Sequence, residues 1–212
     1  MDALLPERTT LAGRYATLVP LRADRHAEDL WQETSGHDRD PLWLYLGDGP
    51  FSDFDAFRKS IEAKATSPEA VFFAILDADG RAAGYASLMR IEPLHRVVEV
   101  GNILYGPRLQ KTCAATEAMY FLARYVFQDL NYRRYEWKCI ALNQPSRRAA
   151  LRYGFVNEGL FRQHMIVKGR NRDTAWFSML DSEWPARKAA FERWLDPTNF
   201  DSGGRQKLPL NC

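Results

Sequence analysis

The stretch that most constrains this chain is a loop of small and polar residues that runs directly into an apolar helix. The loop and the start of the helix occupy residues 109–118 and read LQKTCAATEA. Apolar side chains then recur with the spacing of one helical stripe, at Ala118, Met119, Leu122 and Val126. The pattern predicts a helix that runs to about Leu130, packs against a core and is entered straight from the loop.

The start of this helix is also a candidate anion site. The first N–H groups of a helix have no carbonyl partner within it, and together with the positive end of the helix dipole they bind phosphate. Lys111 and Arg108 would add mobile positive charge beside this site. The alternative is an ordinary helix start with Thr112 as its cap. On this stretch alone both interpretations remain open.

Composition narrows the class of protein. The 212 residues suffice for one domain with a buried core, and 46% hydrophobic residues exclude a disordered chain. A net charge of +2, with acidic and basic residues interleaved, argues against nucleic-acid binding. No apolar run approaches the roughly 20 residues that span a bilayer, and acids and prolines interrupt residues 1–11. We therefore expect a cytoplasmic protein with neither nucleic acid nor membrane as a partner.

Cysteine and histidine give no sign of a metal site. The chain has three cysteines and four histidines, scattered without the short spacing that metal ligands require. The same scatter rules out a disulfide framework. We predict that no metal is bound.

The first 70 residues are predicted to form one strand and two helices, at 15–21, 25–34 and 53–65. Asp24 is a candidate cap of the first helix, and Gly36 its stop. Between the helices, residues 37–50 form a loop that carries Trp43 and Tyr45. These aromatic side chains either plug an edge of the core or form a wall of a substrate pocket.

The middle of the chain changes to strand periodicity. Three strands are predicted, at 71–76, 83–89 and 97–105, and the first two flank a turn at 77–80. Gly101 and Asn102 are poor strand residues in the third strand, which suggests a bulge or close approach of a ligand to the backbone. A further strand at 135–141 follows the apolar helix, so a crossover joins the two strands and the sheet is mixed.

The last third begins with a second candidate helix start, Asn143-Gln-Pro-Ser146, which leads into a helix at 147–153 that Gly154 ends. Two more strands, at 158–167 and 174–180, are joined by a polar turn at 168–173. The predicted division is an N-terminal extension (1–13), the main domain (14–184), a helix packed on it (185–196) and a disordered tail (197–212).

At this point the residues resemble the GNAT superfamily of acyl-CoA-dependent N-acetyltransferases, and within it the ribosomal-protein N-terminal (RimJ/RimL-type) branch. The resemblance covers residues 14–184 and rests on three motifs in order, which are Gln110–Ala118, Asn143 with Ser146, and Gly154-Phe155 followed by Glu158-Gly159. The family's loop signature, Gln/Arg-x-x-Gly-x-Gly/Ala, is matched at Gln110 and Ala115. It is not matched at Cys113, where a glycine would let the backbone approach the pyrophosphate of coenzyme A. A cysteine is compatible with binding if its φ is negative.

The resemblance implies an α+β fold, or three-layer α/β fold, with a mixed, mostly antiparallel sheet of six to seven strands and helices on both faces. The central strands 97–105 and 135–141 would splay apart and admit the pantetheine arm of acetyl-CoA. The residues implied to bind the coenzyme are Asn102, Ile103, Leu104, Gln110, Lys111, Thr112, Cys113, Ala114, Ala115, Thr116, Asn143, Ser146 and Arg148.

The resemblance also implies a mechanism in which an amine attacks the thioester directly. The amine must lose a proton, the carbonyl must be polarised, and the leaving thiolate must be protonated. Glu99 matches the strand glutamate proposed as the base, and an apolar strand environment would make it a stronger base. A glutamate that faces solvent is the alternative. The proton donor to the thiolate is a tyrosine in many relatives, but here Ala150 occupies that position and Tyr153 lies at the wrong phase of the helix to replace it. Ser146 matches a serine that lies near the coenzyme sulfur in the closest branch of the family.

The acceptor is not readable from the sequence. Residues expected near it are Trp43, Tyr45, Glu99, Phe161 and His164. Three functions remain open: an N-acetyltransferase for a small amine or amino-acid-like metabolite, one for a peptide N-terminus, and a coenzyme-binding module without turnover. Either a monomer or a homodimer fits these observations.

Overall fold

The computed structural model describes residues 2–210, which fold into two compact units. Of the described residues, unit 1 comprises 2–4, 93–98 and 119–210, and unit 2 comprises 5–92 and 99–118. Eight strands are hydrogen-bonded in the order β1-β2-β3-β4-β5-β6-β8-β7, and β5 (Val97–Tyr105) contributes to both units. The fold is mixed α/β with a mostly antiparallel sheet, as predicted, although the number of strands is higher than six to seven.

The sheet of unit 2 is built on a fully apolar strand. β3 (Ala70–Leu76) is buried along nearly its whole length and pairs antiparallel with β2 (Thr17–Pro20) and β4 (Ala82–Glu92). The additional strand is β1 (Leu11–Ala12), which pairs with β2 and is too short to show a period in the sequence. The hairpin predicted between β3 and β4 is confirmed.

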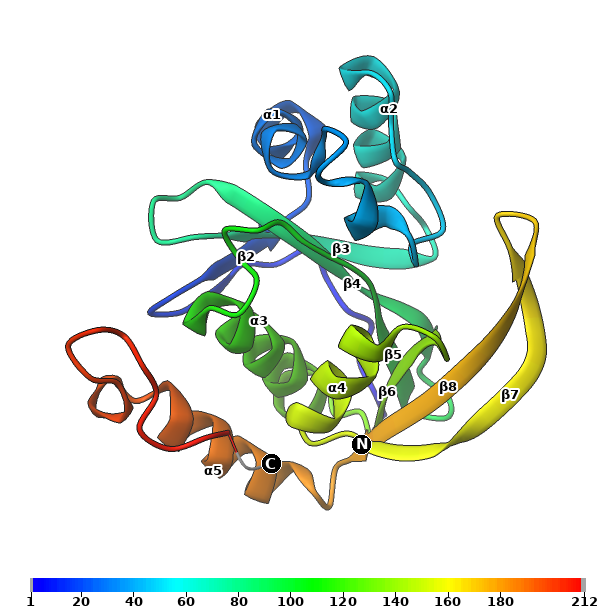
Figure 1. The fold of residues 1–212 in the computed structure, drawn as a ribbon. Coiled ribbons are helices and arrows are strands. Elements are labelled where there is room, and N and C mark those ends of the chain that lie inside the picture. Colours follow the sequence, from blue (N-terminus) through cyan, green and yellow to red (C-terminus); the bar gives the residue numbers. More distant parts are fainter. Residues whose placement is uncertain (1, 211–212) are drawn as a thin grey trace. The chain divides into compact units, whose positions relative to one another are not determined.

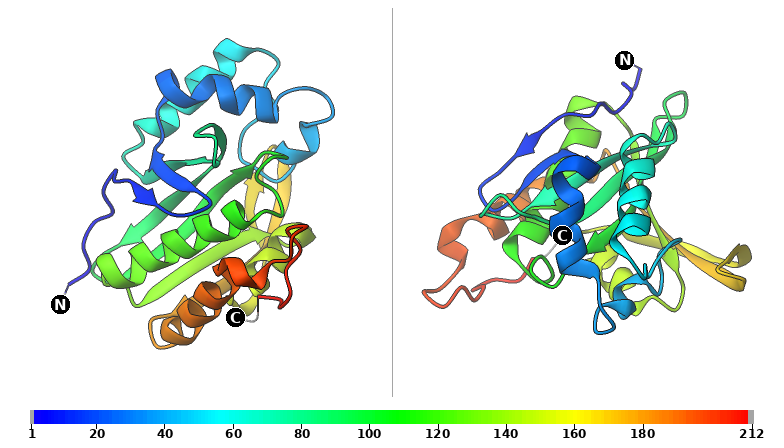
Figure 2. Two further views of the ribbon diagram at one scale, coloured as in Figure 1. Left: turned by 90° about the vertical axis from the view of Figure 1, so that its left-hand side faces the viewer. Right: turned by 90° about the horizontal axis from the view of Figure 1, so that it is seen from above.

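Two helices cover one face of these strands in unit 2, α1 (Ala23–Thr34) and α2 (Phe54–Ala65) (Figures 1 and 2). Asp53 caps α2 by accepting a hydrogen bond from the Ala56 N–H. The predicted cap of α1 is wrong: Asp24 lies inside the first turn, and the N-cap residue Arg22 makes no side-chain cap. A 3-10 turn, η1 (Asp40–Trp43), follows α1.

The N-terminal segment of unit 2 is held by one buried carboxylate. Glu117 lies near the start of α3 (Cys113–Arg124) and is 5% exposed. It accepts hydrogen bonds from the backbone N–H groups of Arg14, Tyr15 and Ala16 at 2.6 to 3.0 Å. Charge-assisted bonds of this kind are about twice as strong as neutral ones, so this segment is fixed to the start of α3.

Unit 1 contains three antiparallel strands, β6 (Arg134–Ile140), β8 (Arg170–Leu180) and β7 (Val156–Val167), in that spatial order. The turn between β7 and β8 is Lys168-Gly169, shorter than the predicted turn at 168–173, because polar residues from Arg170 onward pair with β7. The far end of this hairpin extends well beyond β6 (Figure 2).

The helices of unit 1 are α4 (Gln144–Arg152), α5 (Trp184–Leu195) and the last turns of α3, which continue as a π-helical turn, η2 (Tyr125–Asp129). α5 packs through aromatic stacking: the Trp184 ring lies 5.4 Å from Phe127, and Phe191 lies 6.0 Å from Tyr153.

The prediction of a disordered tail is wrong for residues 197–210. A 3-10 turn, η3 (Pro197–Asn199), follows α5, and Phe200 forms a β-bridge with Gln206. The Trp194 indole N–H donates to the Gln206 side chain at 2.8 Å. The polar composition of the tail concealed these contacts, which depend on α5.

Candidate active site

The loop that enters α3 has the geometry of an anion site. The Thr112 hydroxyl caps the helix by accepting from the Ala115 N–H at 3.1 Å, so the cap that was given as the alternative interpretation is present. Lys111, just before it, adopts the left-handed region with φ +62°. Among the described residues, the N–H groups of Lys111, Thr112 and Ala114 have no hydrogen-bond acceptor. The residues therefore fit a diphosphate, which would accept from such groups.

Cys113 does not adopt a backbone conformation that requires glycine. It is the first residue of α3 and has ordinary helical backbone, whereas the left-handed residue of the loop is Lys111. The departure from the family's signature therefore leaves the path of the backbone intact. The Cys113 thiol is partly exposed.

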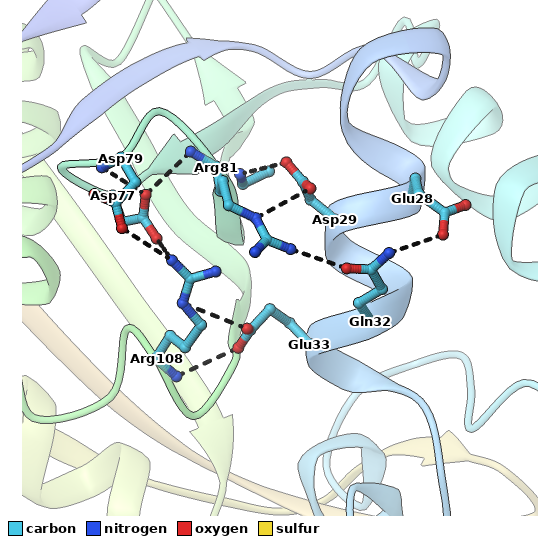
Figure 3. Close-up of polar contacts among 9 residues, drawn as sticks. Glu28, Asp29, Gln32, Glu33, Asp77, Asp79, Arg81 and Arg108 are labelled. Carbon is cyan, nitrogen blue, oxygen red and sulfur yellow. Dashed lines mark hydrogen bonds and ion pairs between the residues drawn. The ribbon is translucent and has the colours of Figure 1, made fainter.

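Arg108 is not a mobile charge beside this loop, which corrects the expectation from the sequence. Its guanidinium forms ion pairs with Glu33 of α1 and with Asp77 in the β3–β4 turn (Figure 3). Arg81 extends the same network to Asp29 and Gln32 of α1 (Figure 3). Arg108 thus ties the chain just before the loop to two other elements of unit 2.

Glu99 is buried in β5, at 3% exposure, so the alternative of a glutamate that faces solvent is wrong. Its environment is not purely apolar either, because Arg90 of β4 donates to its carboxylate at 2.7 Å. The Met89 side chain packs directly against Gly101: a Cβ there would lie 2.5 Å from the Met89 sulfur and 3.6 Å from Glu99 Oε1. The prediction at this glycine was a bulge or the close approach of a ligand, and the group that lies against it here is Met89.

Two non-glycine residues on neighbouring strands of unit 2 have left-handed backbone, Arg90 (φ +47°) in β4 and Asn102 (φ +50°) in β5. This conformation costs an ordinary residue about 1–2 kcal/mol and is concentrated at functional sites. Asn102 is fixed through its amide nitrogen, which donates to the Ser87 hydroxyl and the Met89 sulfur. The backbone irregularity predicted at Asn102 is therefore present.

Both residues line a pocket of about 660 Å³ in unit 2, within the size range of small-molecule sites. The pocket lies between α2 and strands β3, β4 and β5, and its lining includes Asp48, Ser60, Lys64, Glu69, Phe72, Met89, Arg90 and Asn102. The Lys64 ammonium forms an ion pair with Asp48 and donates to Ser60, so that this wall satisfies its own charges.

Trp43 does not line this pocket. It is 2% exposed, its indole N–H donates to the Thr34 carbonyl at 2.9 Å, and its ring belongs to the core of unit 2. The core interpretation is therefore right for Trp43, and a role as a pocket wall is wrong. Tyr45 is half-buried.

In unit 1, the second helix start brings Asn143 and Ser146 together. Asn143 caps α4 by accepting from the Ser146 N–H at 3.0 Å. The Ser146 hydroxyl accepts from the Trp137 indole N–H of β6 at 2.9 Å. Burial raises the pKa of the neighbouring Cys139 thiol, and a hydrogen bond with Ser146 offsets only part of this effect. Cys139 is therefore a protonated thiol at neutral pH rather than a nucleophile.

The structure also accounts for the positions around the absent tyrosine. Ala150 is fully buried in α4, and Tyr153 is 7% exposed in its stack with Phe191, so Tyr153 serves packing. Arg148 is exposed on α4, and its guanidinium has no partner in the described part of the chain.

Phe161 and His164 come together on the β7–β8 hairpin of unit 1. A register shift between Phe161 and Met165 places Phe161 4.6 Å from the Trp176 ring and 5.5 Å from His164. His164 shares a hydrogen bond with the Thr174 hydroxyl at 3.1 Å. Phe161 is half-exposed and borders a hollow of about 680 Å³.

Arg90 and the Lys64–Asp48 pair were missed by the sequence reasoning. A signal for Arg90 existed: counting outward from the turn at 93–96 pairs Arg90 with Glu99 and Ser87 with Asn102. No comparable local signal joins Asp48 to Lys64, because a helix and a loop bring them together.

Within residues 2–210, no cluster of three histidine, cysteine or acidic side chains is placed to hold a metal ion. None of the helices described is long and apolar enough to cross a membrane.

Several known proteins are similar to this chain in fold and in sequence. The model of a family described as "Acetyltransferase (GNAT) domain" matches residues 16–156. The crystal structure of a GCN5-related N-acetyltransferase from Brucella melitensis is 48% identical with a TM-score of 0.96, covering 99% of this chain and 95% of that one.

Two relatives carry names that mention ribosomal substrates. A Bacillus subtilis protein named "Putative ribosomal N-acetyltransferase YdaF" is 29% identical over 81% of this chain and 92% of its own. The ribosomal-protein-serine acetyltransferase of Escherichia coli is 34% identical over 47% of this chain and 56% of its own. The chain therefore belongs to the GNAT family of acetyltransferases and is a GNAT-type N-acetyltransferase, which confirms the resemblance seen in the sequence.

Proposed function

We propose that the protein transfers the acetyl group of acetyl-CoA to a primary amine, which attacks the thioester directly in a ternary complex. The observation that carries this proposal is the buried Glu99 carboxylate, paired with Arg90 at the pocket between α2 and β5. A buried carboxylate beside a polar pocket is suited to accept a proton from a bound amine.

Each unit contains candidate residues for coenzyme binding. In unit 2, the loop from Gln110 to Thr116 would hold the diphosphate through its free N–H groups, with the Lys111 ammonium adding charge. The β5 residues Asn102, Ile103 and Leu104 would contact the acyl arm through their backbone. In unit 1, Asn143 and Ser146 would contact the pantetheine arm, and the unpaired Arg148 would bind phosphate.

The chemistry then follows from these groups. The amine nitrogen forms a bond to the acetyl carbon while its proton passes to Glu99, directly or through one water. Backbone N–H groups of residues 102–104 stabilise the negative charge that develops on the carbonyl oxygen. As the carbon–sulfur bond breaks, the Ser146 hydroxyl donates a hydrogen bond to the leaving thiolate. The thiolate takes up a proton from water to give free coenzyme A, and Glu99 returns to water the proton that it accepted from the amine.

The acceptor is proposed to be a peptide N-terminus or a small amine, and the names of the relatives support testing ribosomal peptides first. The test is release of coenzyme A thiol from acetyl-CoA in the presence of a panel of amines and N-terminal peptides. We expect amine-dependent release together with an acetylated product identified by mass spectrometry. If the protein binds the coenzyme but no acceptor causes release of coenzyme A thiol, the proposal is contradicted. The remaining interpretation is then a coenzyme-binding module without turnover.

A further inference from the structure

We propose that Arg90 is a specificity-determining residue, which binds the oxygen of a carbonyl or carboxylate group next to the acceptor amine. The proposal rests on the function above, because it assigns a role in the same pocket. It requires that the acceptor be an α-amino carbonyl compound, such as a peptide N-terminus or an amino acid derivative, rather than a plain alkylamine or a polyamine.

The first argument is the unused capacity of the guanidinium. An arginine side chain has five N–H donors in a rigid fork. Arg90 Nη1 donates to Glu99 Oε2 at 2.7 Å, and the Arg90 side chain is still 40% exposed while Glu99 is 4% exposed. Arg90 also lines the pocket. It therefore offers further donors to an occupant while it holds the carboxylate.

The second argument is the pattern of donors and acceptors around Arg90. Asn102 uses its amide nitrogen for Ser87 and Met89, and in the described chain its Oδ1 atom accepts no hydrogen bond. The donors of Arg90 thus lie next to a Glu99 oxygen, to which Arg90 is bonded, and line the same pocket as Asn102. An amine supplies protons to such oxygens, and a neighbouring carbonyl oxygen accepts from the guanidinium.

The third argument concerns the opposite wall. Lys64, Asp48 and Ser60 bond to one another, so these groups do not require a charged partner from the acceptor. Of the two cations that line this pocket, Arg90 has the more exposed side chain. Its left-handed backbone (φ +47°) costs conformational free energy, which the rest of the fold must offset. A plain alkylamine would leave the donors of Arg90 unmatched.

The experiment compares two acceptors of the same shape, alaninamide and 1,2-dimethylpropylamine, in which an isopropyl group replaces the amide. Each is assayed with the native enzyme and with Arg90→Lys, which keeps the positive charge beside Glu99 but loses the planar fork. The different basicities of the two amines cancel, because each acceptor is compared only between enzymes.

We expect Arg90→Lys to raise KM for alaninamide roughly 10-fold or more, the scale of a lost charge-assisted hydrogen bond, and to leave KM for the alkylamine within about twofold. Arg58→Gln, an exposed arginine of α2 outside this pocket, serves as the matched control and should change neither value. Equal changes for both acceptors, or no change for either, would overturn the proposal.

Two further measurements complement the kinetic constants. When both amines are offered together, alaninamide should form a larger share of the acetylated product with the native enzyme than with Arg90→Lys, and an unchanged share would overturn the proposal. Calorimetry with coenzyme A present measures alaninamide binding directly. Binding by the native protein that weakens in Arg90→Lys, without any acetylation, would support the role of Arg90 and reject the proposed function alone. Absence of binding would reject the role of Arg90.

Discussion

The Trp137 indole N–H donates to the Ser146 hydroxyl at 2.9 Å, while the Ser146 backbone N–H caps α4 through Asn143. Because the indole occupies one lone pair of the hydroxyl, it fixes the direction in which the hydroxyl proton can be donated. The Ser146 backbone caps α4, and its side chain both accepts from the indole and has the proposed chemical role.

Ser146→Ala should therefore keep the fold and lose rate. The cap of α4 is kept, because it depends on the Ser146 N–H, but the buried Trp137 indole N–H loses its acceptor, so we expect Tm to fall by roughly 2–8 °C. We expect kcat to fall roughly 10- to 100-fold, because the leaving thiolate loses a donor. Steady-state kinetics with saturating acetyl-CoA checks this, and Trp137→Phe should show a smaller loss. An unchanged kcat would remove Ser146 from the reaction.

Glu99→Gln should lower kcat by roughly 10²–10⁴-fold, the usual scale for loss of a general base. Glutamine keeps the size of the side chain and an oxygen for Arg90 but cannot accept the amine proton. Coenzyme affinity, measured by calorimetry, should stay within about twofold, because Glu99 is not among the residues proposed to bind the coenzyme. A variant with full activity would show that another group takes the proton.

Cys113 and Cys139 should differ in reactivity toward iodoacetamide. Cys113 is partly exposed, whereas Cys139 is buried with a raised thiol pKa, so we expect alkylation at Cys113 to be at least about 10-fold faster. Peptide mass spectrometry distinguishes the two sites. Coenzyme A should slow alkylation of Cys113 if the loop binds the diphosphate; equal rates with and without coenzyme A would argue against that assignment.

Glu158 gives a pH-dependent contribution to stability. The Arg134 guanidinium, assisted by Ser178, holds the pKa of this carboxyl at about 2, against the opposing effect of burial. A lowered folded-state pKa means that the stabilisation is complete above about 4.5, the ordinary value, and is lost as the pH falls toward 2. The free energy of unfolding of Glu158→Gln should be lower than that of the native protein by about 1 kcal/mol or less at pH 7, since the pair is partly solvated. Urea titrations should show the difference shrinking between pH 4.5 and 2; a difference that grows toward low pH would contradict this account.

Elements rich in β-branched and other apolar residues were predictable from the sequence. β5 was predicted at 97–105 and spans those residues, because such residues favour a strand. Whether Cys113 lies in the loop or in the helix was not predictable. Its backbone conformation depends on that choice, because a loop residue can need a positive φ and a helical residue does not. Local patterns place the first residue of a helix only to within a turn.

Long-range partners set the remaining differences. The Trp194–Gln206 contact orders a tail whose composition is typical of disorder, and no local pattern announces it. In the sequence, Trp43 is an aromatic residue in a polar loop, a pattern that fits a pocket wall as well as a core residue. Its burial depends on contacts with Phe51 and Phe57, which lie on either side of the start of α2. Site residues on one strand, such as Glu99, were predicted more readily than a pocket assembled from four elements.

The left-handed Lys111 has a thermodynamic consequence for recruitment of the coenzyme. The Thr112 cap and the Arg108 ion pairs already fix the chain on both sides of Lys111. The backbone N–H groups of this loop therefore need not become ordered when the diphosphate binds. The entropic cost of shaping the loop is met once, during folding, and does not recur at each turnover. Coenzyme binding should accordingly show the enthalpy of the hydrogen bonds formed, with little opposing entropy from the loop.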